Sequence, residues 1–255
     1  MNKILAISVN TFKESIRDKT LLSLSILGFL LIAASKIFVP ISIGQAHKII
    51  KDFGIGMVEL FSLFTVVLIG TRILYQEIER KTIYSIMSKP VRDWEFVFGK
   101  FLGLYYLIIF IQFILFIIFI LFTRFYLGGV DWYLLNALYF FLFEFLLLNA
   151  LALFLSCFTT PITAGILTLM MFFIGQLTHY LKDLVVVMKL PELSPIVNFL
   201  YFILPNFSIF NVKASVVYHI PISINSYFLA FSYSVLYSTI LLILSSIFYS
   251  LKEYQ

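Results

Sequence analysis

The chain has 255 residues, of which 62% are hydrophobic and only 12% are charged, and its mean hydropathy is +1.04. A soluble domain has about 45–50% apolar and roughly 25% charged residues, so this composition excludes a soluble globular protein, a disordered chain and a nucleic-acid-binding module. The formal net charge is +5, and the basic residues lie beside apolar segments, where they set the orientation of membrane helices. The sequence therefore predicts an integral membrane protein.

The first predicted element is an amphipathic helix over residues 3–18. Leu5, Val9, Phe12 and Ile16 recur at helical spacing, and charged and polar residues occupy the other positions. A helix with this pattern lies in the membrane interface with its apolar side toward the lipid. A leader that faces the solvent is the alternative.

Six apolar segments then follow, each long enough to cross a hydrocarbon core of about 30 Å. The expected fold is an all-α polytopic membrane protein, a single transmembrane domain over residues 1–255 with six transmembrane helices. The expected spans are 21–39, 54–75, 101–122, 132–154, 161–180 and 224–249.

Residues 182–222 depart from this pattern, because prolines interrupt a sequence that stays apolar. A proline-broken stretch does not span a bilayer, and it suits short half-helices that enter one interface and pack on protein. With six spans, eleven of the 18 Lys and Arg residues share the side of the two termini. This bias predicts cytoplasmic termini, a cytoplasmic 76–100 loop and an outer 182–222 segment.

The 76–100 loop is the most charged part of the chain. Glu77 and Lys81 have the spacing of a favourable helical ion pair, and Pro90 ends that helix and can begin a new one through Arg92 and Trp94 into the third span. The end of the predicted helix carries an apolar patch with charged residues around it, formed by Ile83, Ile86 and Met87. Such a patch favours docking onto another protein. The alternative is that the loop is charged only to fix the membrane topology. From the residues alone, the two interpretations are equally open.

Four of the polar residues inside the predicted spans are candidates for a translocation path or for contacts between helices. Glu144 lies near the middle of the fourth span, and the others are Gln112, Gln176 and Glu59. An ionisable group within a membrane is costly and is by default a functional candidate. Two interpretations stay open: a translocation or dimer-facing surface, and hydrogen bonding between neighbouring helices. The single Cys and three scattered His residues predict no metal site.

Motifs in three places resemble those of ABC-2-type permeases, the membrane subunits of ATP-binding-cassette (ABC) transporters. The main one is the string EIERKTI at 77–83 with the residues SKP at 88–90, Arg92 and the pairs 95–96 and 99–100. The tract 204–213 resembles the proline-containing outer segment of that family, and residues 10–18 resemble its amphipathic leader. The most similar branch comprises permeases associated with multicopper-enzyme maturation, such as that of the nitrous-oxide-reductase copper system.

The resemblance implies a half-transporter of the type V exporter kind, which pairs with a second copy or a homologue. In this family the loop after the second span is a coupling helix that docks onto a separate ATPase. The matching positions are Glu77, Glu79, Arg80, Lys81, Thr82, Ser88, Lys89, Pro90 and Arg92.

The sequence contains no G-x-x-x-x-G-K-[ST] phosphate loop. We therefore expect no enzyme activity and no bound cofactor in this chain, with ATP and Mg on a soluble ABC ATPase subunit. The expected partners are that ATPase, a second permease and the lipid bilayer, without nucleic acid. The resemblance also implies a multi-pass protein of a bacterial or archaeal plasma (inner) membrane and, as the family expectation, export.

Two other functions are alternatives for a membrane chain of this kind. An ion-coupled secondary carrier would use Glu144 and Glu59 as proton sites, but such carriers often contain internal repeats, and none is evident. An intramembrane metal-dependent protease would need several histidines and a second acidic ligand at one site, whereas His179 stands alone near the end of a predicted span.

Overall fold

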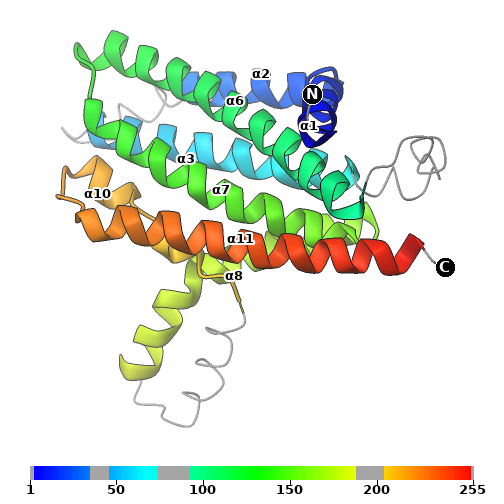
Figure 1. Ribbon diagram of the computed structural model, residues 1–255. Coiled ribbons are helices and arrows are strands. Elements are labelled where there is room, and N and C mark those ends of the chain that lie inside the picture. Colours follow the sequence, from blue (N-terminus) through cyan, green and yellow to red (C-terminus); the bar gives the residue numbers. More distant parts are fainter. Residues whose placement is uncertain (1–2, 35–45, 74–91, 188–203, 254–255) are drawn as a thin grey trace.

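The computed structural model describes residues 3–34, 46–73, 92–187 and 204–253. Within these ranges every regular element is a helix, which confirms the all-α prediction (Figure 1). The elements are α1 (Lys3–Ile16), α2 (Lys19–Ala34), α3 (Ala46–Thr65), η2 (Val66–Gly70), α6 (Asp93–Leu127), η3 (Trp132–Leu134), α7 (Leu135–Ser156), α8 (Pro161–Val187), η5 (Phe207–Phe210), α10 (Lys213–Val217) and α11 (Ile224–Glu253).

Five described helical stretches are long and apolar enough to cross a membrane, against six predicted spans. They are His47–Ile73, Asp93–Tyr126, Trp132–Ser156, Pro161–Thr178 and Ile224–Leu251. The first predicted span, 21–39, corresponds to α2, whose 16 described residues rise about 24 Å and are shorter than a full crossing. Residues 35–39 of that span lie outside the described part of the chain.

The central helix of the bundle is α7. Fifteen of its 22 residues are buried, and it contacts α6, α8, α11 and α3. An all-round apolar sequence such as this one suits a helix enclosed by others. Polar residues on α7 are therefore held inside the protein and away from lipid.

Both termini lie at one end of the bundle, which we call the termini end (Figure 1). The Lys3 ammonium is 3.8 Å from the Glu95 carboxylate at the start of α6. The ring of Phe96 stacks on that of Tyr249, near the end of α11, with centroids 5.4 Å apart. The loop at 128–131, α10 and the start of α11 form the opposite end, the far end.

Helix α1 packs on α6 through small and polar residues together with Ile7 and Phe12, whereas the other residues of its apolar stripe face outward. Ser8, Thr11 and Ser15 are buried, while Leu5 and Val9 are exposed. A Cβ atom at Gly103 would lie 2.6 Å from the Ser8 carbonyl oxygen, so the two backbones approach closely. Small residues permit such close contact between membrane helices. The sequence pattern located the apolar stripe and did not identify this contact face.

We expect Gly103→Val to displace α1 from α6, because the added side chain meets Ser8 and Thr11 at overlapping distances. The reporter is Ser8→Cys, since the native Cys157 is buried. Maleimide labelling of the new thiol should be slow in the single Ser8→Cys variant. It should be at least about tenfold faster once Gly103→Val is added, as expected for a contact costing more than about 1.4 kcal/mol. Equal labelling rates would contradict this packing.

Residues 204–220, which we call the far-end segment, pack on protein. Phe207 and Phe210 are fully buried. The Asn206 side-chain oxygen accepts a hydrogen bond of 2.9 Å from Thr178 on α8, and its backbone N–H donates one of 2.8 Å to the Tyr233 hydroxyl on α11. The segment is thereby fastened to two helices.

The described parts of the predicted 182–222 region are the end of α8 and two short helical pieces. Residues 182–187 continue α8, because the first proline of the region comes later, at Pro191. The described remainder holds only η5, of four residues, and α10, of five. Residues 188–203 lie outside the described part of the chain.

Candidate functional site

Two buried carboxylates lie near the middle of the bundle, at positions that the sequence analysis singled out. Glu59 on α3 is 7% exposed and Glu144 on α7 is 1% exposed. Each lies about 13 residues from the far-end start of its helical stretch, and 13 residues of helix rise about 20 Å. The two side chains are close enough to interact electrostatically.

The ion-pair partner of Glu59 is Lys213, the first residue of α10. The Lys213 side chain is partly exposed, while the Glu59 side chain is buried. The far-end segment therefore inserts an ammonium group into the bundle, and Lys213 also acts electrostatically on Glu144. Sequence analysis placed Lys213 in the outer segment and did not foresee this pair.

The Gln176 side-chain amide on α8 donates a hydrogen bond of 2.6 Å to Glu144 Oε1. Among the described residues, Glu144 Oε2 has no hydrogen-bond partner. The Gln112 side-chain amide donates to the carbonyl of Phe141, at 3.5 Å, and not to Glu144. The structure thus brings together three of the four predicted intramembrane residues and Lys213, and Gln112 lies beside them with a different partner.

This cluster, Glu59, Glu144, Gln176 and Lys213, holds two carboxylates and one ammonium. A charge buried without a partner is costly in low dielectric, so Lys213 stabilises both acids as it links the far-end segment to α3. Among the described residues, no three His, Cys, Asp or Glu side chains are placed to hold a metal ion. The chemistry of the cluster is that of charge pairing between helices.

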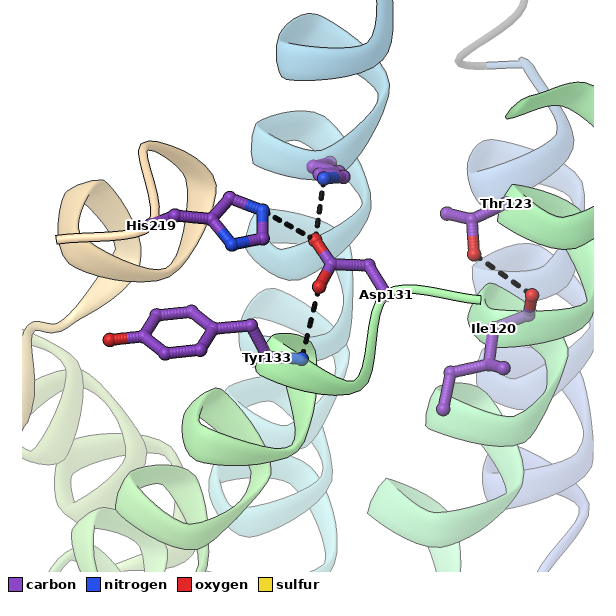
Figure 2. A network of polar contacts seen from close by, with 6 residues as sticks. Ile120, Thr123, Asp131, Tyr133 and His219 are labelled. Carbon is purple, nitrogen blue, oxygen red and sulfur yellow. Dashed lines mark hydrogen bonds and ion pairs between the residues drawn. The ribbon is translucent and has the colours of Figure 1, made fainter. Parts of the chain in front are cut away.

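A second polar network lies at the far end and is centred on Asp131 (Figure 2). One carboxylate oxygen of Asp131 is 2.5 Å from Lys51 Nζ and 2.9 Å from His219 Nε2. The other oxygen accepts the Tyr133 backbone N–H at 3.0 Å. The ring of His219 also stacks on that of Tyr133, with centroids 5.1 Å apart. The network joins α3, the 128–131 loop and the far-end segment.

Burial alone would raise the pKa of Asp131, but the hydrogen bonds from Lys51 and Tyr133 and the nearby charges hold its pKa below the ordinary value. A lowered folded pKa stabilises the protein at pH values above the unfolded pKa, which is about 3.9. This stabilisation is lost as the pH falls through the folded pKa.

We therefore expect Asp131→Asn to lower stability at pH 7 by about 2 kcal/mol, the contribution of a charge-assisted hydrogen bond. The difference from wild type should shrink as the pH falls below about 4, because the wild-type carboxylate is then protonated. Thermal unfolding of both proteins in detergent at pH 7, 5 and 3 measures this difference in stability. A difference that stays constant across this range would contradict the ion-pair assignment.

Of the predicted coupling residues, only Arg92 lies in the described part of the chain. It is exposed, precedes α6, and its backbone N–H donates to the Glu95 carboxylate at 3.0 Å, which caps the start of the helix. The positions outside the described residues are Glu77, Glu79, Arg80, Lys81, Thr82, Ser88, Lys89 and Pro90.

Comparison with known proteins identifies the family to which this chain belongs. The family model of "ABC-2 family transporter protein" matches residues 5–253. No curated protein matches the chain. The match extends over α1, all five candidate spans and the far-end segment. The chain belongs to the ABC-2 family of transporter proteins.

Proposed function

We propose that this chain is the membrane permease subunit of an ABC exporter and couples to a separate ATPase through its 76–100 loop. The observation that carries the proposal is the family match over nearly the whole chain. The chain would form the translocation path together with a second permease, a copy of itself or a homologue, in a bacterial or archaeal plasma membrane.

The arrangement of the termini end supports this assignment. Helix α1, the start of α6 at Arg92 and the last turns of α11 lie together there. Residues 74–91 join α3 to α6 in sequence, between Ile73 and Arg92, so their two attachment points are the ends of membrane-crossing helices. An ATPase bound at this loop would act directly on both helices. In the proposal this end is cytoplasmic, as the excess of basic residues predicts.

The test is affinity purification of the full chain from native membranes in mild detergent, followed by identification of the bound proteins. We expect a soluble ABC ATPase subunit, and we expect its recovery to fall at least about tenfold with Arg92→Glu, a loss of about 1.4 kcal/mol or more. Arg124→Glu is the matched control, because Arg124 is also exposed but lies near the far end.

Folded chain that repeatedly purifies without an ATPase would contradict the proposal and favour the ion-coupled carrier. That carrier would need Glu59 and Glu144 to exchange protons during transport. In this structure Glu59 is paired with Lys213 and Glu144 accepts a hydrogen bond from Gln176.

A further inference from the structure

A cluster of basic side chains lies near the turn between α1 and α2 and the end of the helical stretch His47–Ile73, at the termini end. Arg17 and Lys19 flank the turn between α1 and α2, and both are exposed, as is Lys13 four residues earlier. Arg72, at the end of the second predicted span, is exposed and acts electrostatically on Asp18 in that turn. Four basic residues thus gather here, and the neighbouring acidic residues are Glu14 and Asp18.

The Asp18 carboxylate forms a hydrogen bond within the protein. Its carboxylate accepts the Thr20 backbone N–H at 2.8 Å and so caps the start of α2. Hydrogen bonding from Thr20, together with the charge of Arg72, outweighs the effect of burial and lowers the pKa of Asp18. With the acid held at the helix start, the exposed surface of the cluster carries an excess of positive charge.

Exposed apolar side chains continue this basic surface toward the middle of the bundle. Leu22 and Ile26 follow Lys19 by three and seven residues, on the same face of α2, and are 62% and 52% exposed. Leu68 lies about one turn before Arg72 and is 38% exposed. Leu68 belongs to η2, which contacts α2, so basic groups lie beside an apolar surface shared by these two helices.

A basic rim above an apolar helix surface matches a phospholipid, whose phosphate lies at the interface and whose acyl chains lie below it. We infer that Arg17, Lys19 and Arg72 form a binding site for anionic phospholipid, with the acyl chains along Leu22, Ile26 and Leu68. The inference is independent of the proposed function, since it concerns the lipid-facing surface of the chain alone.

The test uses the full chain purified in mild detergent and two lipids with identical dioleoyl chains, phosphatidylglycerol and phosphatidylcholine. Native mass spectrometry measures the affinity of each lipid. We expect wild type to prefer phosphatidylglycerol, and we expect Arg17→Gln with Arg72→Gln to weaken phosphatidylglycerol binding roughly tenfold or more, since each basic residue near a membrane surface contributes several-fold. Phosphatidylcholine binding should change less than about twofold.

The matched control is Lys48→Gln with Arg124→Gln, which removes two basic residues near the far end. This control should retain the preference for phosphatidylglycerol, and all variants should keep the helical circular dichroism of wild type. Equal binding of the two lipids by wild type, or a full preference in the Arg17 and Arg72 variant, would overturn the inference. A change in oligomeric state without lipid selectivity would also overturn it and would identify the surface as a contact between subunits.

Discussion

Replacing Lys213 with methionine should destabilise the protein by about 3 kcal/mol, because it leaves the buried Glu59 carboxylate without its ion-pair partner. For a chain of this size that loss lowers the midpoint of thermal unfolding by roughly 6–12 °C. Methionine retains the length and apolar stem of lysine, so the change removes the charge and little packing. Scanning fluorimetry in detergent at pH 7 measures the shift.

The converse change, Glu59→Gln, should lower the free energy of unfolding by less than Lys213→Met does. The Lys213 side chain is 28% exposed and can turn its ammonium toward water, whereas the Glu59 side chain is only 9% exposed and cannot turn its carboxylate in the same way. The loss of stability in the double variant should be clearly smaller than the sum of the two single losses, since in the Glu59→Gln background the Lys213→Met change no longer breaks the Glu59 ion pair and removes only the effect of Lys213 on Glu144. Additive losses in the double variant would show that the two residues do not act as a pair.

A single methyl group at Gly175 should also have a large effect. A Cβ atom there would lie 2.4 Å from the Pro205 carbonyl oxygen and 2.5 Å from the Phe207 ring. Because Phe207 is fully buried, the far-end segment has to shift away from α8. We expect Gly175→Ala to cost about 2 kcal/mol, within the range for overpacked cores, and thermal unfolding in detergent measures it.

Gly56→Ala is the matched control, since a Cβ atom at Gly56 on α3 meets no atom within 4 Å. Alanine favours a helix over glycine by about 1 kcal/mol, so this change should leave stability equal or slightly raised. If Gly175→Ala proved as stable as Gly56→Ala, the close contact between α8 and the far-end segment would be refuted.

The sequence was sufficient to predict the helical class and the approximate positions of the long helices, because hydropathy and helix length follow from local composition. It also marked Glu59, Glu144 and Gln176 as polar residues inside the membrane. Their partners could not be predicted, since Lys213 reaches Glu59 only through the path of the proline-rich far-end segment. No local pattern encodes that path.

The contact face of α1 could not be predicted from the sequence for a different reason. Its apolar stripe is evident from the sequence, and in a membrane such a stripe can face lipid as readily as protein. The contact with α6 depends on small residues, Gly99 and Gly103 against Ile7, Ser8 and Thr11. Close packing in membranes is governed by shape and not by hydrophobicity. The coupling positions from Glu77 to Pro90 rest on the family resemblance alone.

The central claim, that an ATPase docks at the termini end, is tested most directly by photo-crosslinking from one tryptophan at each end. Trp94 near the termini end is 48% exposed, and Trp132 near the far end is 71% exposed. Each is replaced in turn by benzoylphenylalanine in the full chain, and native membranes are irradiated. We predict a cross-link to an ABC ATPase subunit from position 94 and none from position 132. A cross-link to that subunit from position 132, with none from position 94, would contradict the account.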